Sequence, residues 1–182
     1  MKISIGPIQY FWGREKILAF YDQLIDTRVD IVYLGETVCS KRRELTLNDW
    51  LEIAGRLAAS GKEVILSTLA LLEAGSELVG LQQIAENNVY PVEANDVAAV
   101  QLLAGHGPFV LGPHINVYNN ETLAFLHRLG AKRWISPVEL GRNTITRLHE
   151  NRPPAMETEI FAYGRLPLAF SARCFSARAH DK

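Results

Sequence analysis

The chain alternates short apolar runs with longer amphipathic stretches. The run at residues 31–34 has an apolar character throughout, which is typical of a strand covered on both faces. Residues 50–58 then place apolar side chains at helical spacing. Thr46 followed by Asp49 predicts the N-cap of that helix, and Gly61 stands where the helix should stop. The same order of strand, helix and stop recurs along the chain.

This recurrence predicts strands separated by helices. The strands are predicted at residues 3–5, 31–34, 64–66, 90–93, 109–111, 133–136 and 159–163, and the helices at 17–25, 50–58, 78–85, 97–104, 121–129 and 144–150. Such strands pair in parallel, because each return crossover needs a helix. The turn Gly6-Pro7-Ile8-Gln9 lacks the glycine-rich phosphate motif of a doubly wound fold. We therefore expect an α/β fold, a parallel (β/α) barrel of TIM type, as a single domain over residues 1–182. About seven strand–helix units are present, so we expect a barrel truncated at its C-terminus.

The composition and charge of the chain limit the kinds of partner that we expect. The chain has 182 residues, 48% of them hydrophobic, and a net charge of −1, so no nucleic acid is expected as the main partner. The basic run at 41–43 could still steer a small anion. The N-terminus does not resemble a signal peptide, and no segment has the roughly 20 apolar residues of a membrane span. We expect a cytoplasmic protein, in which a disulfide between Cys39 and Cys174 is improbable.

Candidate chemistry should lie where the strands of a parallel barrel end. The predicted strand ends and the loops after them carry Glu36, Glu93, His114, Asn116 and Glu139. We expect these residues to face a substrate, with Glu139 or His114 handling a proton. Three carboxylates at one rim need a cation or a shared proton, and the arginines available are Arg42, Arg142, Arg165 and Arg173. Glu93 and Glu139 could equally be salt-bridged rim residues, and His114 a satisfied polar contact.

The cysteines admit two interpretations. Cys39 lies in a polar loop, and Cys174 follows Arg173 in a basic setting that favours the thiolate. Either could instead be a thiol without a role. A zinc site or a 4Fe-4S cluster needs about four protein ligands, and the sequence offers two cysteines, no C-x-x-C and no pair of histidines at ligand spacing. Spacing alone therefore supports a metal site only weakly.

Two segments carry a resemblance to a known family. Residues 159–175, EIFAYGRLPLAFSARCF, resemble the signature of the collagenase-like peptidase family, in which Glu-x-Phe is followed by Gly and an apolar run ending in Cys. Together with residues 33–43, YLGETVCSKRR, they look most similar to the UbiV branch, of anaerobic ubiquinone biosynthesis. The resemblance implies a 4Fe-4S cluster with Cys39 and Cys174 as ligands and two further cysteines beyond Lys182. It also implies a heterodimer with the paralogue UbiU that hydroxylates a prenylated aromatic ring without oxygen.

Two other functions stay open. A peptidase-like hydrolase would fit the family name, although the sequence supplies no defensible Ser-His-Asp order and no H-E-x-x-H motif. An RNA-hydroxylation factor is the other, since relatives with this barrel act on RNA. The near-neutral charge counts against it.

Overall fold

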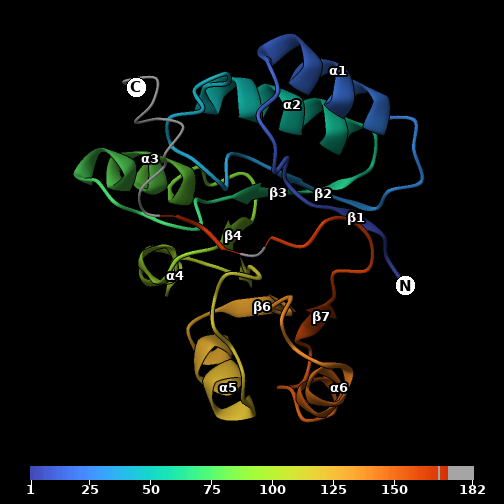
Figure 1. Ribbon diagram of the computed structural model, residues 1–182, viewed down its shortest axis with the longest axis vertical. Coiled ribbons are helices and arrows are strands. Elements are labelled where there is room, and N and C mark those ends of the chain that lie inside the picture. The colour runs from blue at the N-terminus through green and yellow to red at the C-terminus, as the bar shows by residue number, and fades with distance from the viewer. Residues whose placement is uncertain (168, 172–182) are drawn as a thin grey trace.

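The structure is a computed structural model that describes residues 1–167 and 169–171. Its strands form one parallel sheet in chain order, and the helices lie outside the sheet (Figure 1). The strands are β1 (Ser4–Ile5), β2 (Ile31–Leu34), β3 (Glu63–Ser67), β4 (Val92–Ala94), β5 (Phe109–Leu111), β6 (Ala131–Ile135) and β7 (Glu157–Glu159). The helices are α1 (Arg14–Leu24), α2 (Leu47–Ala59), α3 (Gly75–Ala85), α4 (Val97–Leu103), α5 (Asn120–Arg128) and α6 (Arg142–Glu150). The sheet is an incomplete α/β barrel, which confirms the predicted fold class.

Local signals explain several element boundaries. The N-terminus of α2 is a capping box, in which the Thr46 hydroxyl accepts from the Asp49 backbone N–H at 3.3 Å. The Asp49 carboxylate accepts in return from the Thr46 N–H at 2.7 Å. Two orphan donors of the first turn are thus satisfied. Gly61, just past the helix, adopts a φ of 87°, the left-handed conformation that favours glycine.

The seventh strand lies earlier than predicted. It spans Glu157–Glu159 rather than residues 159–163, and Ile160 and Phe161 are exposed after it. The prediction followed the apolar residues of this segment. In the structure, glutamates alternate along the strand: Glu157 contacts Arg133, and Glu159 contacts Tyr33. Strand β4 differs in the other direction, because it begins two residues later than predicted. The remaining strands match their predicted positions to within two residues.

The hydrophobic core lies mainly between the sheet and the helices. One cluster packs β4, β5 and β6 against α3 to α6, with Trp134 fully buried. A second packs β2 and β3 against α1 and α2 around Tyr21 and Leu57. The inner face of the sheet carries only a small apolar cluster, formed by Ile31, Tyr33, Ile65, Val110 and Ile135. The rest of the inner face is polar.

The edge strands of the sheet approach each other on this inner face. The Ser4 hydroxyl of β1 donates to the Glu159 carboxylate of β7 at 2.5 Å. Strands β1 and β7 do not pair with each other in the part of the chain that the structure describes. Side chains rather than a backbone ladder therefore connect the two edges.

Candidate functional site

The loop after β2 holds Cys39 at the carboxyl end of the sheet. Cys39 is a free, half-buried cysteine. The Glu36 carboxylate accepts hydrogen bonds from the backbone N–H groups of Val38 at 2.8 Å and Cys39 at 3.0 Å. The Arg42 guanidinium lies 3.7 Å from the same oxygen. Burial raises the pKa of Glu36, and these hydrogen bonds and Arg42 offset part of the rise. Glu36 therefore shapes the backbone of the Cys39 loop.

Gly35 is required where β2 turns into this loop. Its φ is +136°, which side-chain-bearing residues rarely adopt. A Cβ atom there would lie 2.6 Å from the Ser67 carbonyl oxygen of β3. The glycine lets the two strand ends approach closely and fixes where the Cys39 loop begins.

A small hollow lies beside the Cys39 loop. Its walls are mostly apolar and aromatic, with Glu36 and Arg42 as polar members. Tyr10 and Phe11, from the segment after β1, are 53% and 61% exposed. The hollow is lined by Ile8, Tyr10, Phe11, Trp12, Ile17, Gly35, Glu36, Arg42, Glu44, Leu45 and Trp50.

Glu93 lies on the inner face of β4 and is only 2% exposed. Burial raises the pKa of its carboxyl to about 7, hydrogen bonds with the side chains of Ser67 and Asn95 lower it in part, and the Glu159 charge raises it further. Its Oε2 atom has no hydrogen-bond partner among the described residues. A carboxyl group in this state can hold or release a proton near neutral pH.

His114 lies half-buried in the loop after β5. Burial lowers the pKa of its imidazole to about 4, against a small opposing effect of the Glu139 charge. Its ring contacts the Phe170 ring edge-on, with centroids 4.5 Å apart. His114 is therefore neutral at physiological pH and can accept or donate a hydrogen bond, but it does not supply a cation.

Asn116 and Glu139 meet at the exposed part of the rim. The Tyr118 hydroxyl lies 3.1 Å from the Asn116 side-chain oxygen and donates to the Glu139 carboxylate. The bond to Glu139 raises the pKa of Tyr118. Tyr118 thus joins the loops after β5 and β6, a role that the sequence analysis missed.

The predicted site residues therefore fall into separate groups at one end of the barrel. Glu36 lies with Cys39, Glu93 is buried within the sheet, and Asn116 and Glu139 share Tyr118. Cys174 lies outside the described residues. Among the described residues, no group of three or more histidine, cysteine, aspartate or glutamate side chains could hold a metal ion. Cys39 is the predicted cluster ligand that the structure describes, and a full ligand set is not present in the described part of the chain.

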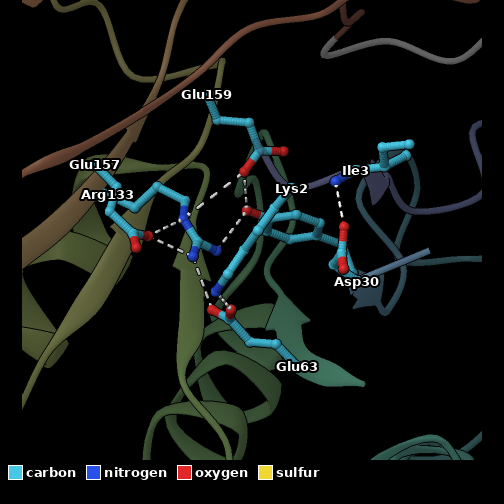
Figure 2. Close-up of polar contacts among 8 residues, drawn as sticks. Lys2, Ile3, Asp30, Glu63, Arg133, Glu157 and Glu159 are labelled. Atoms are coloured by element: carbon cyan, nitrogen blue, oxygen red, sulfur yellow. Dashed lines mark hydrogen bonds and ion pairs between the residues drawn. The ribbon is translucent and has the colours of Figure 1, made fainter. Parts of the chain in front are cut away.

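An ion-pair network surrounds Arg133 on the inner face of the sheet, and Figure 2 shows its members. The buried Arg133 guanidinium of β6 lies 2.8 Å from the Glu63 carboxylate, and it also pairs with Glu157. Its Nε lies 3.9 Å from Glu159, which accepts at 2.7 Å from the Tyr33 hydroxyl. Arg133 is not among the four arginines that the sequence indicated as partners, because its carboxylates come from distant strands.

Comparison with known proteins places the chain in a family. Residues 18–182 match the sequence profile of Peptidase family U32. The chain belongs to the peptidase U32 family. This finding confirms the collagenase-like family that the sequence resembles. The UbiV branch stays a prediction.

The chain is 30% identical over 158 residues to "tRNA hydroxylation protein P" of Helicobacter pylori. The match covers 80% of this chain and 36% of the relative, so the chain spans about a third of that protein's length. No solved structure gives a significant match. None of the helices in the described ranges is long and apolar enough to cross a membrane.

Proposed function

We propose that the chain is part of an iron–sulfur protein that serves hydroxylation of a prenylated aromatic ring in ubiquinone biosynthesis. The observation that carries the proposal is the setting of Cys39, a free, half-buried thiol in a loop fixed by Glu36, with an aromatic-lined hollow beside it. The loop belongs to one of the two segments that resemble the UbiV branch. The proposed partner is the paralogue UbiU, as a heterodimer.

The hollow and the overall charge support an apolar aromatic substrate. Tyr10, Phe11 and Trp12 offer ring faces and edges against which an aromatic substrate could stack. A net charge of −1 does not provide the basic surface that a nucleic acid backbone needs. We therefore rank a small aromatic substrate ahead of RNA.

A 4Fe-4S cluster would supply electron transfer when bound. Cys39 would be one ligand, Cys174 a second, and two further cysteines would follow Lys182. Glu36 would keep the Cys39 backbone in place through its two hydrogen bonds. Glu93, His114, Asn116 and Glu139 would face the substrate, with neutral His114 offering a hydrogen bond and Glu139 accepting a proton.

The proposal is tested by anaerobic complementation with the full-length gene. The host lacks its own oxygen-independent hydroxylation genes of this family, and UbiU is supplied together with the protein. Ubiquinone should reappear with the wild-type protein and with Ser40→Ala, and should stay absent with Cys39→Ser. Ubiquinone that is restored equally by Cys39→Ser would reject the role of the cysteine. If none of the three forms restores ubiquinone, the proposed substrate is rejected.

RNA hydroxylation is a second candidate because of the 30% identity to a protein named for tRNA hydroxylation. Both functions add a hydroxyl group to a substrate, so the same barrel could serve either. The discriminating measurement is the content of hydroxylated nucleosides in tRNA from the complemented strain. Restored nucleosides without ubiquinone would favour the second candidate.

A further inference from the structure

Arg42 is the member of the basic run at 41–43 that lines the hollow beside the Cys39 loop. Its side chain is 23% exposed, whereas the next residue, Arg43, is exposed. A guanidinium that is largely withdrawn from water needs partners within the protein. The partners of Arg42 therefore indicate what this side chain does.

The Arg42 side chain connects two segments that are far apart in the sequence. Its Nη1 atom donates to the Gln9 carbonyl oxygen at 3.1 Å. The same atom lies 3.7 Å from Glu36 Oε1, the oxygen that accepts from the Cys39 backbone N–H at 3.0 Å. A guanidinium Nη carries two hydrogens, so one nitrogen can serve both oxygens. The backbone of Gln9 is thus joined to that of Cys39 through a single ion pair.

The backbone of Cys39 is held from both of its sides. Its N–H donates to Glu36, and its carbonyl oxygen accepts from the Arg42 backbone N–H at 3.0 Å. Both bonds therefore involve a member of the Glu36–Arg42 pair. A displacement of Arg42 acts on Cys39 through the side chain and through the backbone at once.

The aromatic segment, residues 9–12, depends on the same guanidinium. In the described ranges, the bond from Arg42 to the Gln9 carbonyl is the only hydrogen bond that reaches the backbone of this segment from elsewhere in the chain. Tyr10 and Phe11 follow Gln9 and are exposed. Exposed residues with few bonds to the rest of a protein are the ones that move most readily. Arg42 therefore limits the positions that these two rings can take.

The other end of the aromatic segment is fixed by α1. The Trp12 ring packs edge-on against Phe20, with ring centroids 5.4 Å apart. The Lys16 ammonium lies 4.3 Å from the centroid of the Trp12 ring. The two exposed rings are therefore suspended between an anchor on α1 and the bond from Arg42.

We propose that Arg42 is a positioning residue that couples the aromatic segment to the Cys39 loop. A ring that packs on Tyr10 or Phe11 restricts the segment, and Arg42 transmits this restriction to the backbone of Cys39. The inference rests on the proposed function, in which an aromatic substrate occupies the hollow and Cys39 is a cluster ligand. Because coupling is reciprocal, the state of the Cys39 loop also changes the affinity of the segment for the ring.

A double-mutant cycle tests the coupling without a ligand. The measurement is backbone amide hydrogen exchange at residues 38–42 in the anaerobically purified full-length protein, expressed relative to the amides of α5 to remove changes in global stability. Trp12→Leu releases the anchor on α1 and should speed this exchange about 3- to 10-fold when Arg42 is present. In the Arg42→Met background, Trp12→Leu should have no further effect. An equal effect of Trp12→Leu in both backgrounds overturns the inference.

A second measurement uses 2-prenylphenol as the probe on the full-length protein with UbiU. Saturating probe should slow exchange at residues 38–42 about 5- to 10-fold in the wild-type protein, and Arg42→Met should abolish this response. Arg43→Met removes the same charge from the exposed neighbour and should keep the response. Equal rates with and without the probe in the wild-type protein, or equal slowing in wild type and Arg42→Met, overturn the inference.

The outcomes separate this inference from the proposed function. Restored ubiquinone in the complemented strain, together with an additive double-mutant cycle, keeps the ring-hydroxylation role and rejects the coupling. A response to 2-prenylphenol that Arg42→Met abolishes, without restored ubiquinone, keeps the coupling and rejects that role.

Discussion

The buried carboxyl of Glu93 should make the stability of the protein depend on pH in a way that one substitution removes. Glu93 is 2% exposed, and its Oε2 has no partner among the described residues. Burial disfavours the charged form, which is why the pKa of the carboxyl rises to about 7. Glu93→Gln keeps the shape of the side chain and removes its ionisation.

The sign and size of the effect follow from the two pKa values. The pKa is raised in the folded state, so the stabilising contribution is fully present below the unfolded value of 4.5 and is lost as pH rises through about 7. Each pH unit between the two values corresponds to about 1.4 kcal/mol, so the full loss is about 3.4 kcal/mol. Between pH 5 and pH 8.5 the wild-type protein should lose about 2.5 kcal/mol that Glu93→Gln keeps.

The assay is urea unfolding of both proteins at several pH values in that range. Groups common to both proteins cancel in the difference between their free energies of unfolding, which isolates Glu93. Glu139→Gln, an exposed rim substitution, is the control and should change the free energy of unfolding by less than about 0.5 kcal/mol at any pH. A difference between wild type and Glu93→Gln that does not change with pH would refute the reasoning.

Two further predictions concern the inner face of the barrel. Arg133→Met should lower the free energy of unfolding by about 2–3 kcal/mol, because it removes the buried cation that Glu157 and Glu159 share, whereas Glu63 keeps its pair with Lys2. Arg56→Met, which breaks a partly exposed pair between α2 and α1, should cost less than about 1 kcal/mol by the same urea assay, and equal costs would contradict the assignment. Gly112→Ala should cost about 1–3 kcal/mol in thermal or urea unfolding, because its Cβ would overlap Asn95. Gly80→Ala on α3 meets no neighbour and should stabilise by about 0.5–1 kcal/mol, and a neutral Gly112→Ala would show that Asn95 can move.

Local signals explain how far the fold could be predicted from the sequence. Residues 31–34 form a strand because an uninterrupted apolar run suits a strand buried on both faces. Thr46 and Asp49 mark the start of α2 because the capping box lies within four residues of sequence. The order of strands follows from the helical crossovers alone. These elements need no long-range information.

The polar contacts on the inner face of the sheet could not be predicted from the sequence. Glu157 and Glu159 alternate on β7 and would be typical of a solvent-exposed segment, yet they pair with Arg133 and Tyr33. Arg133 reaches Glu63 across 70 positions of sequence, and only the closing of the sheet brings them together. The sequence therefore could not indicate which arginine neutralises which carboxylate. An alternation of charged residues in a parallel-barrel sequence is a signal that could have located β7.

The sequence predicted which loops carry the candidate site residues, but it did not predict the contacts that these residues make. The strand-end rule correctly placed Glu36, His114, Asn116 and Glu139 in the loops that follow strands. It did not reveal that Glu36 is held by the Cys39 backbone or that Tyr118 joins Asn116 to Glu139. These contacts depend on loop conformation, which residue spacing does not determine.

The most direct test of the account concerns Cys39 as a ligand of an iron–sulfur centre. The measurement is the iron and sulfide content of the full-length protein, purified without oxygen, for wild type, Cys39→Ser and the neighbouring control Ser40→Ala. Wild type and Ser40→Ala should contain equal iron and sulfide, and Cys39→Ser should lose most of both. Iron and sulfide that are undiminished in Cys39→Ser, or absent from the wild-type protein, would contradict the account.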